Sequence, residues 1–121
     1  MPWNRTARDA MAFPGPQVSH DTTIDVALSV LAGAGVEHLL IRDDDGVCSG
    51  LVTRAELTAR RAGSWFLEET RLRDVTHDKG PFTAADTALD TADTAMRDRM
   101  LEVSPVIDAH GFALGVLTSP R

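Results

Sequence analysis

The sequence predicts an α+β chain built from two copies of one structural unit. Residues 39–57, LLIRDDDGVCSGLVTRAEL, return in part as residues 104–121, SPVIDAHGFALGVLTSPR. Both stretches read as an apolar run, an acidic turn ending in Gly, a second apolar run, and then Gly, two aliphatic residues and Thr. A segment with apolar residues at helical spacing precedes each stretch. The matched pairs, each 65 positions apart (111 − 46, for example), include Gly46 and Gly111, Gly50 and Gly115, and Thr53 and Thr118.

A short helix and a short strand are expected to open the first copy. Residues 4–12 mix small apolar residues with Arg and Asp, a pattern that is compatible with a helix. The sequence Phe-Pro-Gly-Pro at 13–16 should stop this helix. Gln17 and Val18 can then form a strand.

A longer amphipathic helix follows this strand. Asp21 and Thr22 offer side-chain oxygens that can cap its first turn. Gly33 and Gly35 are expected to end it. One face of the helix is apolar because its apolar residues recur at three- and four-residue spacing: Ile24, Ala27, Leu28, Leu31 and Ala34.

Two strands and a further helix complete the first copy. Residues 39–41 and 47–52 read as strands, and the Asp-Gly pair that ends the acidic turn between them is a hairpin signal. Cys48 lies in the second strand, where we expect a small buried hydrophobic residue and not a redox sensor. Helix-compatible sequence resumes over residues 54–62.

The second copy is expected to repeat this order of elements. Trp65, Phe66 and Leu67 connect the copies and are expected to pack on a shared core. We expect residues 1–62 to form the first motif, 63–70 the connection and 71–121 the second motif, together one globular module. The apolar helical face of the second copy comprises Leu89, Ala92, Met96 and Met100.

Composition argues against several classes of function. The net charge is −6, and an acidic surface repels both nucleic-acid phosphates and anionic lipid headgroups. No apolar run approaches the roughly 20 residues that span a bilayer. A single cysteine excludes an internal disulfide and a multi-cysteine zinc site. We therefore expect a cytoplasmic protein that contacts neither nucleic acid nor membrane.

The ordered set of motifs, present twice, resembles a tandem pair of CBS domains, the regulatory modules named after cystathionine β-synthase. The resemblance covers nearly the whole chain, which is expected to be a stand-alone regulatory protein. The final helix of the second repeat is expected to be missing. The motifs are RDAM at 8–11, DTTIDVA at 21–27, HLLIRDDDG at 38–46 and GLVTRAEL at 50–57, then RDV at 73–75, DTALDTA at 86–92, SPVIDAHG at 104–111 and GVLTS at 115–119.

This resemblance implies two repeats related by pseudo-twofold symmetry, with clefts between them that bind AMP, ADP, ATP or S-adenosylmethionine. Such pairs usually form homodimers, sense a nucleotide, often as an energy signal, and pass the change to a protein partner. They are generally not enzymes and require no cofactor. The alternative is a ligand-free interaction module with the same fold.

The resemblance also assigns residues to the ligand site of the first copy. Thr53 and Glu56 occupy positions where a strand enters a helix, and their oxygens suit the hydroxyls of a ribose. Arg54, between them, can reach phosphates. Gln17, His38 and Leu40 are assigned to the adenine base. The structural alternative is a capping box, in which Thr53 and Glu56 only close the helix N-terminus.

In the second copy the resemblance places Pro105 and Thr118 at the corresponding site. Arg121 stands where the acid would be, and a guanidinium cannot accept hydrogen bonds from ribose hydroxyls. We therefore expect the second site to be degenerate.

The residues favour neither catalysis nor a metal site. His20, His38, His77 and His110 are spread over separate segments without a close pair, so no metal site is expected, and His20 should be solvated. Ser19, although it is followed by His and Asp, lies in an extended segment where adjacent side chains point apart. We expect no catalytic residues.

Overall fold

The computed structural model describes residues 5–63, 68–75 and 82–119 of the 121-residue chain. The chain divides into two compact units. One unit comprises Gly15–Gly80, and the other comprises Met1–Pro14 together with Pro81–Arg121. Each unit carries one three-stranded sheet, so the α+β class predicted from the sequence is confirmed.

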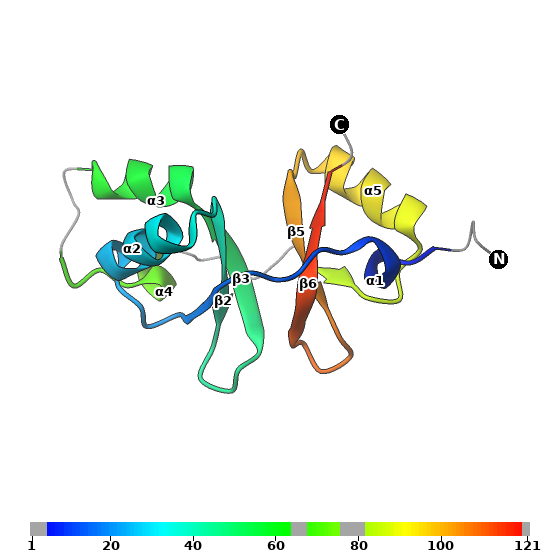
Figure 1. Ribbon diagram of the computed structural model, residues 1–121, viewed down its shortest axis with the longest axis horizontal. Coiled ribbons are helices and arrows are strands. Elements are labelled where there is room, and N and C mark those ends of the chain that lie inside the picture. Colours follow the sequence, from blue (N-terminus) through cyan, green and yellow to red (C-terminus); the bar gives the residue numbers. More distant parts are fainter. Residues whose placement is uncertain (1–4, 64–67, 76–81, 120–121) are drawn as a thin grey trace. The chain divides into compact units, whose positions relative to one another are not determined.

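The Gly15–Gly80 unit has a mixed sheet with helices on one face (Figure 1). Strand β2 is central, parallel to β1 and antiparallel to β3. The elements of the Gly15–Gly80 unit are β1 (Gln17–Ser19), α2 (Ile24–Ala34), β2 (His38–Arg42), β3 (Cys48–Thr53), α3 (Arg54–Arg61) and α4 (Leu72–Val75).

The second unit repeats this arrangement, with α1 and α5 on one side of its sheet (Figure 1). Strand β5 is central, parallel to β4 and antiparallel to β6. The elements of the second unit are α1 (Ala7–Ala10), β4 (Thr83–Ala84), α5 (Leu89–Asp98), β5 (Val103–Ile107) and β6 (Ala113–Thr118).

The central and antiparallel strands of the two units correspond at the separation that the sequence repeat predicts. Strands β5 and β6 begin and end 65 positions after β2 and β3. The register irregularity at Ile41/Arg42 in β2 recurs at Val106/Ile107 in β5. An internal duplication explains this agreement, because a shared backbone path preserves both strand ends and bulges.

The apolar face predicted for residues 24–34 forms the core of the Gly15–Gly80 unit. Ile24, Ala27 and Leu31 are fully buried and pack with Leu39 and Ile41 of β2. These alternate strand residues share one face of the sheet, as the pleat requires. The caps differ from our expectation. Thr23 is the N-cap, one residue after the predicted pair, and Gly33 lies inside the helix, which Gly35 ends with φ 66°.

The core of the other unit is smaller and contains a polar pair. Met96, Val106 and Leu117 are buried there. Thr83 Oγ1 and Ser104 Oγ lie 2.9 Å apart and are also buried. The hydrogen bond satisfies both hydroxyls, which offsets the cost of taking them out of water. The prediction for Met100 was wrong: its side chain is 85% exposed, because α5 ends at Asp98 and Met100 takes a positive φ.

The short helices α1 and α4 each pack on the copy to which they do not belong in sequence. Ala7 N donates to Thr87 O at 2.9 Å, and 65 positions on, Leu72 N donates to Thr22 O at 2.8 Å. Ala7 and Leu72 are both fully buried in the units they join. The spatial units therefore differ from the sequence motifs by a reciprocal exchange of α1 and α4.

The remaining expectations from the sequence concern the connection between the copies, Cys48 and the location of the protein. The residues outside the described part of the chain include Trp65, Phe66, Leu67 and Arg121. Cys48 is buried and free, as expected, and burial raises the pKa of its thiol. Among the helices described, none is long and apolar enough to cross a membrane. The cytoplasmic location stays a prediction.

Candidate functional site

The junction between β3 and α3 holds Thr53 and Glu56 in mutual contact. Glu56 N donates to Thr53 Oγ1 at 3.2 Å, and Thr53 N donates to Glu56 Oε1 at 3.1 Å. Thr53 Oγ1 also donates to Glu56 Oε1 at 3.0 Å. These contacts form the capping box that we gave as the structural alternative. Glu56 is exposed, so its carboxylate stays within reach of solvent and solutes.

Arg54 lies beside this pair in the first turn of α3. Its backbone N–H donates to Glu37 O at 2.8 Å, and Nη1 is 3.8 Å from Glu37 Oε1. The Arg54 side chain is 45% exposed and that of Glu37 79%, so the ion pair is a weak, solvated one. The guanidinium is therefore available to a stronger anion such as a phosphate.

The strands bring the other residues assigned in the first copy to the same sheet. His38 pairs with Thr53 across β2 and β3, and Leu40 pairs with Gln17 across β2 and β1. Gln17 and His38 are half-buried, and Leu40 is fully buried. Leu40 lies on the face opposite Leu39 and Ile41, which pack against the helices. Burial lowers the pKa of His38, so its imidazole favours the neutral form.

The arrangement combines a carboxylate, a hydroxyl and a guanidinium at one helix N-terminus. A carboxylate accepts hydrogen bonds from a pair of adjacent hydroxyls, and a helix N-terminus favours an anion. In Thr53 and Glu56, however, the hydroxyl and Oε1 already bond to each other. A ligand that used these atoms would have to compete with the capping box or use the second carboxylate oxygen.

The corresponding positions of the other unit carry fewer polar side chains. Pro105 is buried in β5 and pairs with Val116, and Thr118 is exposed at the end of β6 and pairs with Val103. Ser119 N donates to Glu102 O at 2.8 Å, as Arg54 N does to Glu37 O. The residue expected to replace the acid, Arg121, is outside the described residues. The degeneracy of this site stays a prediction.

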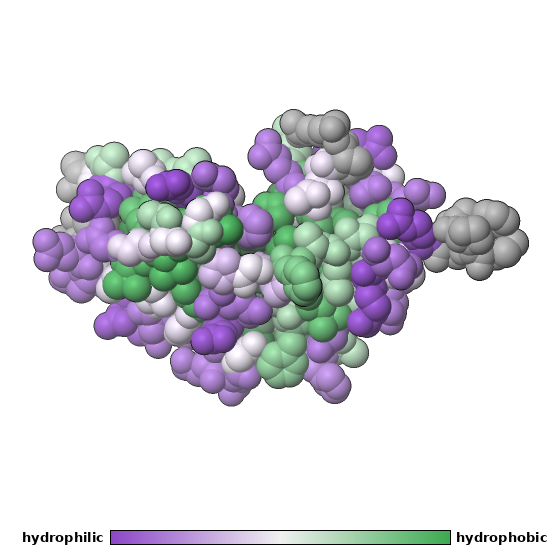
Figure 2. Space-filling model, in the orientation of Figure 1, coloured by the Kyte–Doolittle hydropathy of each residue, from purple (hydrophilic) through white to green (hydrophobic). Residues whose placement is uncertain are grey.

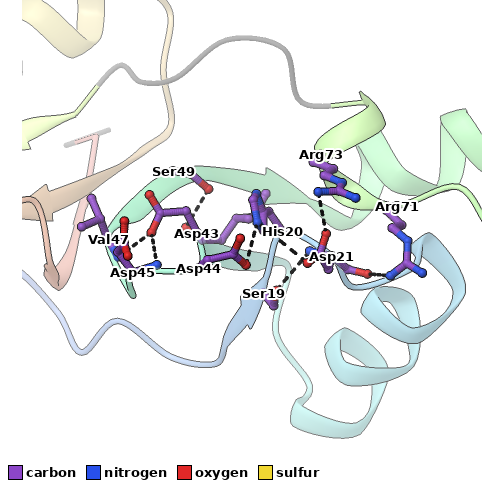
Figure 3. Close-up of polar contacts among 11 residues, drawn as sticks. Ser19, His20, Asp21, Asp43, Asp44, Asp45, Val47, Ser49, Arg71 and Arg73 are labelled. Carbon is purple, nitrogen blue, oxygen red and sulfur yellow. Dashed lines mark hydrogen bonds and ion pairs between the residues drawn. The ribbon is translucent and has the colours of Figure 1, made fainter.

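The structure also assembles a cluster that the sequence reasoning missed. His20 Nε2 lies 3.3 Å from Asp44 Oδ1 and 4.0 Å from Asp21 Oδ2 (Figure 3). The His20 side chain is 21% exposed, less than the solvated histidine we expected. The available signal was the pairing of parallel strands: residues that follow β1 and β2 must emerge at one edge of the sheet. Ser19 Oγ, by contrast, accepts from Asp21 N at 3.1 Å within a local turn.

Comparison with known proteins identifies the repeat. The CBS domain family model matches residues 7–63. A protein described as homoserine O-acetyltransferase from Methanosphaerula palustris is 27% identical over 112 residues. The match covers 93% of this chain and 22% of that protein, so the chain spans about a fifth of the length of this curated relative.

Solved structures match the whole fold. CBSX2 in complex with AMP is 25% identical, with a TM-score of 0.77 over 94% of this chain and 90% of that chain. The CBS domain pair of protein MJ0100, in complex with 5′-methylthioadenosine and S-adenosyl-L-methionine, is 19% identical. Its TM-score is 0.79 over 94% of this chain and 89% of that chain.

The family match, the two units related by one repeat and the likeness to solved CBS pairs agree with one another. Residues 7–63 belong to the CBS domain family, and the chain has the fold of a CBS-domain pair.

Proposed function

We propose that this chain is a non-catalytic regulatory module that binds an adenosine-containing ligand, AMP or S-adenosylmethionine being the first candidates. The observation that carries the proposal is the exposed carboxylate of Glu56 beside the guanidinium of Arg54 at the N-terminus of α3. The ligands of the CBSX2 and MJ0100 structures support the chemical class. Binding would alter the module's contacts with a protein that it regulates.

In this proposal each residue has a separate part. Glu56 accepts hydrogen bonds from the ribose hydroxyls, Thr53 contacts ribose or phosphate, and Arg54 balances phosphate charge. Gln17, His38 and Leu40, on the adjacent strands, contact the base. The neutral imidazole favoured by the lowered pKa of His38 can both donate and accept a hydrogen bond, as recognition of a base edge requires.

Calorimetric titration with AMP, ATP and S-adenosylmethionine tests the site, with Glu56→Gln as the decisive variant. Gln keeps the capping box but loses the charge. We expect its affinity to fall about tenfold to a hundredfold, since a hydrogen bond to a charged group contributes roughly 1.5–3 kcal/mol. Glu69→Gln, the same change at an exposed position outside α3 and both depressions, is the matched control and should bind normally.

A ligand-free interaction module is the second candidate, and the capping box favours it. Thr53 and Glu56 satisfy each other without any ligand. The three compounds are tested at millimolar concentration. If none of them gives a calorimetric signal or a thermal shift, the ligand-free module replaces the adenosine-binding hypothesis. Normal binding by Glu56→Gln would instead move the site away from α3.

We also propose that the chain forms a homodimer through the outer faces of α2 and α5. Val26 of α2 is 53% exposed, and apolar side chains gather over this helix in Figure 2. Shallow depressions of about 330 and 410 Å³ lie on the two helices at positions related by the repeat. They are lined by Asp25, Val26, Ser29 and Val30 on α2, and by Asp90, Thr91, Thr94, Ala95 and Asp98 on α5.

Sedimentation velocity over a range of concentrations tests the dimer. We expect Val26→Lys to raise the monomer fraction, because a lysine buried in an apolar interface loses its hydration. Met100→Lys, at an exposed position outside both depressions, should sediment as the wild type does. A monomer mass at every concentration would contradict the proposal.

A further inference from the structure

One edge of the β1–β2–β3 sheet gathers three side chains that can bind a metal ion. Strands β1 and β2 are parallel, with Ser19 paired to Arg42 at their carboxyl ends. His20 N donates to Arg42 O at 2.8 Å, which continues this pairing by one residue. The turn after β1 and the acidic turn after β2 therefore lie side by side (Figure 3).

The ligand atoms already lie close to coordination distance from a common centre. His20 Nε2 is 3.3 Å from Asp44 Oδ1 and 4.0 Å from Asp21 Oδ2, and the three donor atoms lie within 4.8 Å of one another. Zinc binds nitrogen and oxygen at about 2.0–2.2 Å, so neighbouring ligand atoms around a tetrahedral ion are about 3.3–3.6 Å apart. The 3.3 Å between His20 and Asp44 already has this value, and a small rotation of the His20 ring would bring Nε2 to the same distance from Asp21 Oδ2. Asp44, whose side chain is 80% exposed, can follow this movement.

Neighbouring groups hold Asp21 in place. Arg71 Nη1 donates to the Asp21 backbone oxygen at 2.6 Å. Arg73 Nη1 lies 3.1 Å from Asp21 Oδ1, an atom shielded from solvent that accepts no hydrogen bond from the described residues. Arg73 thus holds one oxygen of the carboxylate, while Oδ2 is the oxygen nearer His20. An outer partner that orients a ligand in this way is a general feature of metal sites.

The acidic turn is equally well ordered. Asp43 Oδ1 accepts from Asp45 N at 2.9 Å and from Val47 N at 3.0 Å, so Asp43 shapes the turn. Asp44 is left to contact His20. The charges of Arg71 and Arg73 balance those of Asp21 and Asp44, and Asp43 and Asp45 in the adjacent turn make the local charge negative.

We propose that His20, Asp21 and Asp44 bind one zinc or similar divalent transition-metal ion per chain. An imidazole nitrogen with two carboxylate oxygens suits such ions, whereas calcium and magnesium prefer oxygen ligands alone. Three protein ligands leave a fourth position for water. The other repeat lacks this set, since Ala85, Asp86 and Ala109 occupy the positions 65 residues further on. One ion per chain is therefore the expected stoichiometry.

Titration of tag-free, chelator-treated protein with zinc chloride tests the site by calorimetry. We expect one equivalent to bind, with affinity at least tenfold lower in both Asp44→Asn and His20→Gln. Asp86→Asn and His110→Gln, which change exposed residues of the other unit, are matched controls and should bind as the wild type does. Cobalt(II) offers a second readout, because its visible absorption should change on binding and this change should be absent in His20→Gln.

Two results would overturn the proposal. One is no stoichiometric binding at micromolar zinc, which would leave the cluster as a hydrogen bond between two turns. The other is binding that Asp44→Asn leaves unchanged or that His110→Gln weakens equally, which would indicate adventitious surface binding. Circular dichroism shows whether His20→Gln is folded. If His20→Gln misfolds, the Asp44→Asn variant still tests the site, because Asp44 is exposed and its substitution should not disturb the fold. Neither result bears on adenosine binding, since Thr53 and Glu56 lie outside the cluster.

Discussion

Replacing Leu72 with alanine is expected to lower the free energy of unfolding by about 2–5 kcal/mol, the usual cost of truncating a fully buried leucine. Leu72 lies on the four-residue helix α4, which is too short to be stable without tertiary contacts. Its side chain is 0% exposed and packs in the core with Ile24 and Leu31. Truncation removes apolar contacts and leaves a cavity that the surrounding sheet and helices cannot fill.

Urea unfolding followed by circular dichroism measures this change, and hydrogen exchange localises it. Protection should fall in β2 and β3, since the core that contains Leu72 also contains residues of both strands. Met100→Ala, at an 85% exposed position, is the control and should stay within about 0.5 kcal/mol of the wild type. A loss below about 1 kcal/mol for Leu72→Ala would mean that α4 contributes little to this unit.

Gly115→Ala should be the second strongly destabilising change. A Cβ atom at this position would overlap the backbone oxygen of Ala12 and lie 2.9 Å from Met11 Sδ. The backbone oxygen cannot move without disturbing the bridge to β6, in which Ala12 N donates to Val116 O at 2.9 Å and Val116 N to Ala12 O at 3.1 Å. We expect a loss of about 1–3 kcal/mol from overpacking, with up to about 1 kcal/mol more for each weakened hydrogen bond.

Gly33→Ala provides the matched control for this substitution. Gly33 lies inside α2, and a Cβ there would meet nothing within 4 Å. Alanine should therefore raise stability by about 0.5–1 kcal/mol, because glycine loses more backbone freedom than alanine on entering a helix. Equal effects of the two substitutions would contradict the close approach of residues 11–12 to β6.

The parts of the fold that could be predicted from the sequence are those that depend on neighbouring residues. Thr53 and Glu56 are three residues apart, so a helix that starts between them brings their side chains together whatever surrounds it. The hairpin between β2 and β3 follows from two apolar runs around an acidic turn. The elements of the second unit could be predicted from those of the first, because equal spacing of turn residues in two copies implies an equal backbone path.

The wrong predictions concern the ends of helices, where the spacing of apolar residues or a glycine was taken as the only signal. Met100 continues the apolar spacing of Ala92 and Met96, yet the helix ends before it. Gly33 is tolerated inside α2 because the helix gains enough from burying Ile24 and Leu31 to outweigh one unfavourable residue. Helix ends depend on such differences of about 1 kcal/mol, which spacing alone does not reveal.

The sequence by itself determined the duplication, the order of strands and helices, the apolar face of each long helix and the capping pair at Thr53. Only the tertiary structure decided which unit each short helix joins. Ala7 and Leu72 are buried in units made largely from the other copy, and a four-residue helix carries no pattern that names its partner. The contact of His20 with Asp44 likewise depends on tertiary structure, since the two residues are 24 positions apart and the parallel pairing of β1 with β2 brings them together.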